Sequence, residues 1–220
     1  MQVNKQYVNG DMVDRFDAMS EQILSSGKRM YIRENFFASM IDKSGFKIGV
    51  EIGVDVGDFS HKLLSKCQLD RLYGIDCWSD GFGSDFRPGF YAQAGCDRYS
   101  RCRIALNEFV NNGRSHLIKG KSVDVATKFD DSCFDFVYID GDHSMEMLFD
   151  LYAWTPKVKL GGVIAGHDFK CNKNSGIKDF WGEQFDYAVQ PCAEYYTRRF
   201  GHKLNVVGGV VKSFWFVRNR

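Results

Sequence analysis

Short apolar runs, each followed by a segment with helical spacing, recur along the chain. The first run is FKIGVEIGV at 46–54, which is rich in β-branched residues. In the segment after it, Phe59, Leu63, Leu64 and Cys67 recur at helical intervals. This pattern predicts a strand, a tight turn and a helix in succession.

The same alternation continues along most of the sequence. Further strands are predicted at 71–78, 115–121, 134–143 and 161–168. Helices are predicted at 98–112, at 144–154 and around 177–185. Near-continuous apolar strands that alternate with helices are typical of a parallel sheet covered on both faces, so we expect a doubly wound α/β fold.

Both ends of the chain depart from this rhythm. Residues 1–40 form a polar extension that predicts one or two helices. At the other end, two strand-like runs at 203–210 and 212–219 meet near Gly208 and Gly209, which predicts an antiparallel hairpin. We therefore expect a seven-stranded, mostly parallel sheet in one domain, 1–220, because 220 residues suit a single α/β core.

Composition narrows the classes of partner. The formal net charge of +1, from 29 basic and 28 acidic residues, gives no global electrostatic reason to expect nucleic acid or an anionic membrane. No signal-peptide pattern is present, and no apolar stretch approaches the roughly 20 residues of a membrane helix, so we expect a soluble, cytoplasmic protein. The seven cysteines form no CxxC pair and are expected to be reduced and mostly buried.

Residues 79–97 form a long segment rich in glycine and aromatic side chains between a predicted strand and the next helix. In a doubly wound sheet such a segment lies over the carboxyl ends of the strands, where ligands bind. It is interpreted as an active-site loop that acts as a lid, with an irregular surface insertion as the alternative.

The strongest local signal is VEIGVDVGDFS at 50–60, at the junction of the first strand and its helix. Glycines in such a turn let the backbone approach a ligand closely. Glu51 lies inside an otherwise apolar strand, where a buried carboxylate is costly unless it is paired or bound to a ligand. The turn lacks the G-x-G-x-x-G pattern that cradles a pyrophosphate, so a cofactor without phosphates fits better.

Asp76 ends the second predicted strand. Folds of this kind place an acid at that position to accept hydrogen bonds from both hydroxyls of a ribose. A simple strand-end cap is the alternative role. Together with Glu51 and the glycine turn, Asp76 favours a cofactor that carries a ribose.

Four segments resemble the class I S-adenosylmethionine-dependent methyltransferases, which have a Rossmann-like fold: VEIGVDVGDFS, YGIDCW, IKGKS and FDFVYIDGDHSMEMLFDLYAWTPKVKLGGVIAGHDF. The resemblance covers residues 47–170 and is strongest to the macrocin-type, methyltransferase domain 24-like O-methyltransferases. The terminal SFWFVRN is also similar to the last strand of that family.

The resemblance implies S-adenosyl-L-methionine as the cofactor. It places Glu51 and Gly53 beside the methionine part, Asp76 at the ribose, and Cys77 or Trp78 near the adenine. Gly120, Lys121 and Ser122 would border the adenine edge, with an ordinary turn as the alternative. The full set of implied cofactor residues is Glu51, Gly53, Val54, Gly57, Ser60, Asp76, Cys77, Trp78, Gly120, Lys121, Ser122 and Asp140.

Polar residues gather where two predicted strands end. Asp140, Asp142 and His143 follow the fourth strand, and His167 and Asp168 follow the fifth. Neighbouring parallel strands bring them to one stretch of the carboxyl edge of the sheet, here called the rim. Oxygen and imidazole groups gathered there can bind a divalent cation or move protons. The structural alternative is that the two aspartates after the fourth strand cap the next helix and that His167 only hydrogen-bonds within the rim.

In the metal-dependent O-methyltransferases that the chain resembles, one carboxylate after the fourth strand and two consecutive residues after the fifth bind magnesium. Those positions here are Asp140, His167 and Asp168. An imidazole at this place suits manganese, iron or zinc better than magnesium, so the identity of the metal stays open, with magnesium or manganese as the candidates. A cation would orient an acceptor hydroxyl and lower its pKa. His143 or His167 is the candidate general base if no metal takes part.

We therefore expect methyl transfer to an oxygen of a small molecule or sugar, with Asp140, His143 and His167 as catalytic candidates. A metal-dependent hydrolase or hydroxylase-like enzyme is the first alternative, and a catalytically silent binding module is the second. The acceptor and the oligomeric state stay open, because the N-terminal helices can either pair two subunits in a homodimer or cover their own domain.

Two aromatic groups in the last third of the chain are interpreted as packing. Phe149, Tyr152 and Trp154 have a spacing that fits a helix packed on the sheet. The segment with Tyr195 and Tyr196, followed by Arg198 and Arg199, is interpreted as a C-terminal helix with a solvated basic edge.

Overall fold

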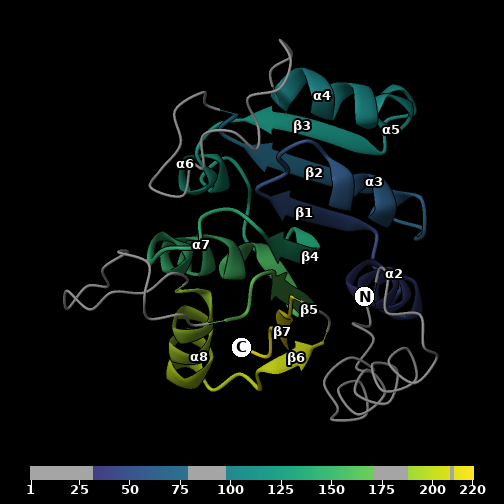
Figure 1. Cartoon of the computed structure of the whole chain (residues 1–220). Helices are drawn as coiled ribbons and strands as arrows, with labels where there is room; N and C mark the ends of the chain where they lie inside the picture. The colour runs from purple at the N-terminus through teal and green to yellow at the C-terminus, as the bar shows by residue number, and fades with distance from the viewer. Residues whose placement is uncertain (1–31, 79–97, 171–187, 209–210) are drawn as a thin grey trace.

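A computed structural model describes residues 32–78, 98–170, 188–208 and 211–220 (Figure 1). These residues form a seven-stranded sheet in the order β3-β2-β1-β4-β5-β7-β6. Its strands are β1 (Ile48–Ile52), β2 (Arg71–Asp76), β3 (Ser115–Lys119), β4 (Phe134–Ile139), β5 (Val158–Gly166), β6 (Asn205–Val207) and β7 (Ser213–Val217).

The first five strands pair in parallel, and β7 lies antiparallel between β5 and β6. The predicted doubly wound, Rossmann-like α/β fold with a C-terminal antiparallel hairpin is confirmed. The strand order reverses direction at β1, which lies between β2 and β4. In such folds, ligands bind at the carboxyl edge of the sheet near this switch point. A binding site is therefore expected at the carboxyl ends of β1, β2 and β4.

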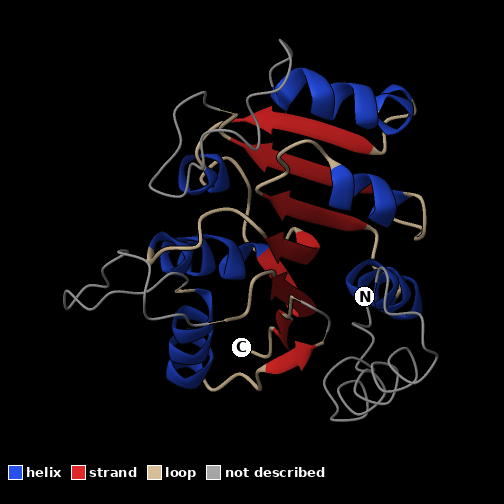
Figure 2. Cartoon of the chain, viewed as in Figure 1, coloured by secondary structure: helices blue, strands red, loops and turns tan. Residues whose placement is uncertain are grey.

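Helices cover both faces of the sheet (Figure 2). The helices are α2 (Ile32–Ser44), α3 (Asp58–Leu64), α4 (Arg98–Ala105), α5 (Asn107–Asn111), α6 (Ser122–Ala126), α7 (Glu146–Trp154), the short 3-10 helix η2 (Thr155–Lys157) and α8 (Val189–Phe200). Side chains of α2, α3, α4 and α5 share one core, and those of α6, α7 and α8 share the other.

The alternation of side chains along β4 explains why two cores form. Phe136 and Tyr138 belong to the core under α2 and α3, whereas Val137 and Ile139 belong to the core under α7 and α8. Successive residues of a strand point to opposite faces, so an uninterrupted apolar run fills both layers.

Helix α2 is the described part of the N-terminal extension, and it packs on its own sheet. Phe36, Phe37, Met40 and Ile41 are each fully buried. The ring of Phe37 lies edge-on to Tyr138 on β4, with the centroids 5.1 Å apart. This helix therefore covers its own domain.

Several boundaries differ from the sequence prediction. The helix predicted at 98–112 is two helices, α4 and α5, separated at Leu106. Strand β5 begins at Val158 instead of at residue 161, and α6 was not predicted. The predicted helix at 177–185 and the predicted loop at 79–97 lie outside the described residues, as do residues 1–31 of the extension.

Two further expectations concern the chain as a whole. Among the residues that the structure describes, no helix has both the length and the apolar composition needed to cross a membrane. Five cysteines fall within the described ranges and form no disulfide there, and Cys67, Cys102 and Cys192 are buried.

Candidate active site

The turn after β1 brings the backbone of β1 and β4 into close contact. Gly53 has φ +83°, and a Cβ at this position would collide with the backbone carbonyl of Asp140. Gly57, with φ +88°, precedes the first turn of α3 and closes the turn through a hydrogen bond to the carbonyl of Val54. The two glycines are required here because a side chain fits neither the conformation nor, at Gly53, the space.

Glu51 on β1 is buried, with 1% of its surface exposed. Its carboxyl group accepts a hydrogen bond from the hydroxyl of Ser60 on α3. Burial raises the pKa of Glu51 to about 8, and the nearby carboxylates of Asp140 and Asp76 act in the same direction. The buried acid that the sequence predicted is therefore present and is neutral at pH 7 unless a cation approaches it.

Asp76, at the end of β2, is tied to the glycine turn. Its Oδ2 accepts a hydrogen bond from the amide of Asp55 at 2.9 Å, and its Oδ1 accepts one from the amide of Trp78 at 2.8 Å. The indole of Trp78 in turn donates to the carbonyl of Asp55 at 2.8 Å. The carboxylate thus caps the strand, and each oxygen retains a lone pair that can accept a ribose hydroxyl.

The two residues after Asp76 differ in exposure. Trp78 is buried at 4% exposure and packs against Tyr99, with ring centroids 4.8 Å apart. Cys77 is exposed. Of the two residues predicted near the adenine, Trp78 is therefore fixed within the core and Cys77 lies at the surface.

The turn after β3 reaches the same edge of the sheet. The amide of Gly120 donates to the carbonyl of Asp76 at 2.9 Å, which places this turn beside the end of β2. The hydroxyl of Ser122 accepts a hydrogen bond from the indole of Trp154 at 2.6 Å and so joins α6 to α7. Lys121 is exposed. Gly120 and Lys121 therefore fit an adenine edge better than the side chain of Ser122 does.

The rim at the ends of β4 and β5 brings together the predicted polar residues. Nε2 of His143 lies 2.9 Å from Oδ2 of Asp168. Nδ1 of His167 lies 3.1 Å from the same oxygen and 3.4 Å from Oδ1 of Asp140. Asp142 instead accepts a hydrogen bond from the amide of Ser144 at 2.6 Å. It therefore holds the local turn and does not cap α7, which begins at Glu146.

The charges of the rim are strongly coupled. Burial alone would lower the pKa of His167, but hydrogen bonds to Asp140 and Asp168 raise it to about 9. Burial alone would raise the pKa of Asp168, but the hydrogen bonds from His143 and His167 hold it well below its ordinary value. His167 is therefore protonated at neutral pH in this arrangement and cannot accept a further proton.

A possible set of metal ligands differs in one residue from the predicted set. Ligand atoms of Asp140, His143 and Asp168 lie within 4.8 Å of one another. Two carboxylates and an imidazole suit manganese, iron or zinc, and suit magnesium less well. The sequence placed His167 in this set, whereas the structure groups His143 with the two aspartates and gives His167 the hydrogen bonds described above.

Arg33 on α2 is a site residue that the sequence did not reveal. Its Nη1 lies 3.2 Å from Oδ2 of Asp140, and its Nη2 lies 3.1 Å from Glu34. The guanidinium also lies over the ring of Phe59, 4.6 Å from the centroid. An arginine 107 positions from its partner carries no local signal, and only the packing of α2 brings the two together.

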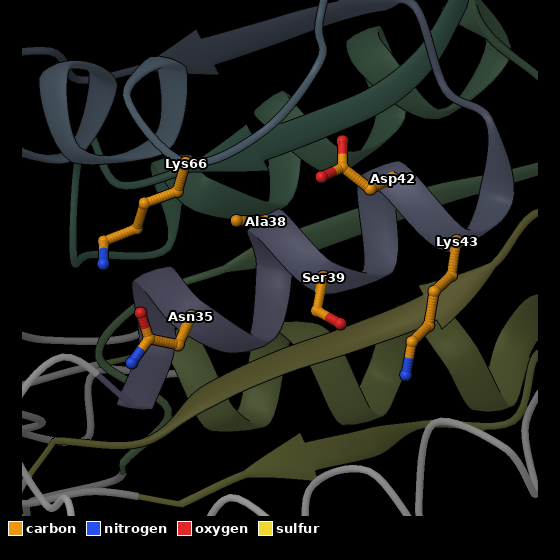
Figure 3. Close-up of a pocket in the computed structure, with 6 residues that line it drawn as sticks. All are labelled: Asn35, Ala38, Ser39, Asp42, Lys43 and Lys66. Carbon is orange, nitrogen blue, oxygen red and sulfur yellow. The ribbon is translucent and has the colours of Figure 1, made fainter.

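A separate hollow lies on the outer face of α2 (Figure 3). It has a volume of about 360 Å³ and is lined by Asn35, Ala38, Ser39, Asp42, Lys43 and Lys66. None of the residues predicted for the cofactor or the rim lines it. We place the functional site at the carboxyl edge of the sheet, because the glycine turn, the buried acid and the coupled rim meet there.

The fold and this site define the class of protein. A sheet with this strand order, a glycine turn after β1 and an acid at the end of β2 form the Rossmann-like methyltransferase fold. The family model described as "Methyltransferase domain" matches residues 50–169, which is more than half of the chain. The chain belongs to this methyltransferase family, and its resemblance to the class I methyltransferases is confirmed.

Solved structures support the same fold. A protein assigned as a caffeoyl-CoA O-methyltransferase from Staphylococcus aureus is 13% identical, with a TM-score of 0.61 over 95% of this chain and 100% of that one. An O-methyltransferase from Bacillus cereus in complex with SAH is 14% identical, with a TM-score of 0.57 over 97% and 94% of the two chains.

A third structure shows that the same fold serves another acceptor. The precorrin-6y C5,15-methyltransferase from Geobacter metallireducens is 13% identical, with a TM-score of 0.52 over 80% of this chain and 81% of that one. No curated protein matches the sequence. At these identities the likeness concerns the fold, so the acceptor has to be argued from the site.

Proposed function

We propose that the protein is an S-adenosyl-L-methionine-dependent methyltransferase that methylates an oxygen of a small-molecule or sugar acceptor in the cytoplasm. The observation that carries the proposal is the hydrogen bond from the amide of Asp55 to Asp76, which joins the glycine turn and the ribose-type acid at one edge of the sheet. The rim of Asp140, His143 and Asp168 lies at the ends of the adjacent strands β4 and β5.

The residues divide between binding and chemistry. Glu51 and the turn at 53–57 hold the methionine part of the cofactor, Asp76 accepts hydrogen bonds from the ribose hydroxyls, and Trp78 packs beside the adenine. A positive ammonium or sulfonium near Glu51 favours the charged form of this acid, because an opposite charge lowers a carboxyl pKa. Most of the rate gain comes from alignment, since the sulfonium methyl is already activated.

Transfer needs one bond exchange and one proton acceptor. The acceptor oxygen forms a bond to the methyl carbon as the bond from that carbon to sulfur breaks, and the hydroxyl proton passes to a base. His143 is the second imidazole of the site, with Nε2 2.9 Å from Oδ2 of Asp168, and we take it as the base because the pKa of His167, about 9, leaves that imidazole protonated.

A metal ion is an optional part of the proposal. Asp140, His143 and Asp168 would hold a divalent cation, and that cation would lower the pKa of the acceptor hydroxyl. In that case His143 serves as a ligand and not as the base. Manganese suits this donor set better than magnesium does.

Membership in a methyltransferase family favours this proposal over a metal-dependent hydrolase or hydroxylase-like enzyme. A silent binding module would bind the cofactor and transfer nothing. A panel of sugar and phenol acceptors with labelled S-adenosyl-L-methionine separates that alternative from the proposed enzyme.

The direct test is calorimetric titration with S-adenosylhomocysteine, with and without manganese. We expect wild type to bind, and Asp76→Asn to bind about 10- to 100-fold more weakly, because hydrogen bonds to a charged group contribute about 1.5–3 kcal/mol. Asp70→Asn is the matched control, since Asp70 is an exposed aspartate just before the opposite end of β2. An absence of binding to wild type under every condition would overturn the proposal.

A further inference from the structure

Three aromatic side chains stay exposed where α7 and α8 meet the solvent. Phe149, Tyr152 and Tyr195 expose 52%, 42% and 50% of their surface. The sequence-based interpretation of Phe149 and Tyr152 as core was wrong, and of that group Trp154 alone is buried. Both helices bury their other faces in the core, and the exposed parts of these three rings are not covered by the part of the chain that the structure describes.

The aromatic side chains form one continuous, supported surface. Tyr152 packs edge-on against Tyr196 at 5.2 Å and against Phe200 at 5.8 Å. Tyr152 and Tyr195 are also linked by a hydrogen bond between their side chains. Phe149 lies one helical turn before Tyr152, so the three exposed rings adjoin one another.

Charges of opposite sign border this surface at its two ends. The start of α7 lies against the first half of α8, where Met145 and Cys192 are 3.7 Å apart, and Tyr152 lies against the last turn of α8. The exposed acids Asp142 and Glu146 therefore lie at one end. The exposed arginines Arg198 and Arg199 lie at the other.

We propose that this α7–α8 face, made of Glu146, Phe149, Tyr152, Tyr195, Arg198 and Arg199, binds a second copy of the chain in a two-fold symmetric dimer. A two-fold rotation stacks the aromatic centre on itself and sets the acidic end of one copy against the basic end of the other. Figure 1 shows α7 and α8 next to each other on one flank of the sheet, away from β3. A self-complementary surface of this kind has the same patch on both subunits.

The pattern of charge selects a second copy over other occupants. A nucleic acid or an anionic membrane would call for one sign of charge across the face, and here both signs are present at opposite ends. Tyrosine, phenylalanine and arginine are the residue types that interface cores favour. A standard interface buries about 800 Å² on each partner, so the contact includes the charged ends as well as the three rings.

A charge swap tests the proposal in solution. Sedimentation equilibrium of wild type up to about 100 µM should show a dimer, since a complex with a micromolar Kd is almost fully formed there. We expect Arg199→Glu and Glu146→Arg each to raise the dimer Kd at least about tenfold, because each variant places like charges at both symmetric ends. An equimolar mixture of the two should restore dimers, because each end of the mixed pair then joins opposite charges.

The controls separate the surface from the fold. Ile104→Glu on α4, where Ile104 is 72% exposed, should dimerise like wild type. The far-UV circular dichroism spectrum of every variant should match that of wild type, because the substituted side chains are exposed and the fold does not depend on them. A monomeric wild type at the highest concentration would overturn the proposal, and so would a mixture that stays monomeric. Neither result depends on S-adenosylhomocysteine binding, so the proposed activity is tested separately.

Discussion

The buried acid Glu51 makes the stability of the protein depend on pH in a direction opposite to that of most carboxylates. Its pKa is about 8 in the folded chain and about 4.5 in an ordinary environment, and burial is the main cause of the difference. Between these two values the folded state holds a proton that the unfolded state has lost. The free energy of unfolding therefore falls as pH rises through this window.

The size of the effect follows from the two pKa values. Each pH unit within the window costs about 1.4 kcal/mol, and the whole window costs about 5 kcal/mol for this one group. Glu51→Gln removes the titration and keeps an oxygen that can accept the hydrogen bond of Ser60. The variant should therefore gain stability relative to wild type by about 1.4 kcal/mol for each pH unit between pH 5 and pH 8.

Urea denaturation of both proteins at pH 5.5, 6.5 and 7.5 measures this difference. The matched control is Glu108→Gln on α5, where the side chain is exposed and the difference from wild type should stay constant with pH. A difference between Glu51→Gln and wild type that is equally flat would refute the reasoning, because a buried acid that is charged at pH 5.5 has no raised pKa.

Two further substitutions probe the contacts that build the site. Gly53→Ala should lower the free energy of unfolding by about 3 kcal/mol or more, because it adds a collision with the carbonyl of Asp140 to the cost of a positive φ. Gly113→Ala has a similar φ of +77° with open space around it, so it should lose only the conformational cost of about 1–2 kcal/mol, and a loss as large as that of Gly53→Ala in thermal melts of both variants would contradict this explanation. Arg33→Met should cost about 1–3 kcal/mol in urea denaturation, since Asp140 and Glu34 lose a partly buried counter-charge. Arg33→Lys should restore part of this loss, and equal effects of the two substitutions would show that packing and not charge is responsible.

The sequence predicted the sheet well because its strands are apolar on both faces. Continuous runs such as that in β4 have no other stable place than the middle of a covered parallel sheet. The start of β5 was missed because Lys159 and Leu160 are exposed and Gly161 and Gly162 interrupt the run. Helix α6 was missed because five residues are too few to show a helical period.

The part of the candidate site that lies at the ends of strands could be predicted from the sequence. Residues in the last positions of β1 and β2, or directly after β4 and β5, must reach one edge of the sheet. Glu51, Asp76, Asp140 and Asp168 could therefore be placed from the pattern alone. Which histidine joins the aspartates depends on side-chain direction within a turn, and the sequence does not encode this visibly. The contact of Arg33 with Asp140 depends on how α2 docks, which is a property of the whole core.

The docking of α2 also has a practical consequence for work on this chain and its relatives. The family match spans residues 50–169, whereas α2 ends at Ser44 and β7 begins at Ser213. A chain shortened to the matched span would lose the packing of Phe37 on the ring of Tyr138 and the ion pair between Arg33 and Asp140. Segments that a family profile leaves out can thus be part of the folding unit. A chain made for expression should therefore include α2 before the matched span and β7 after it.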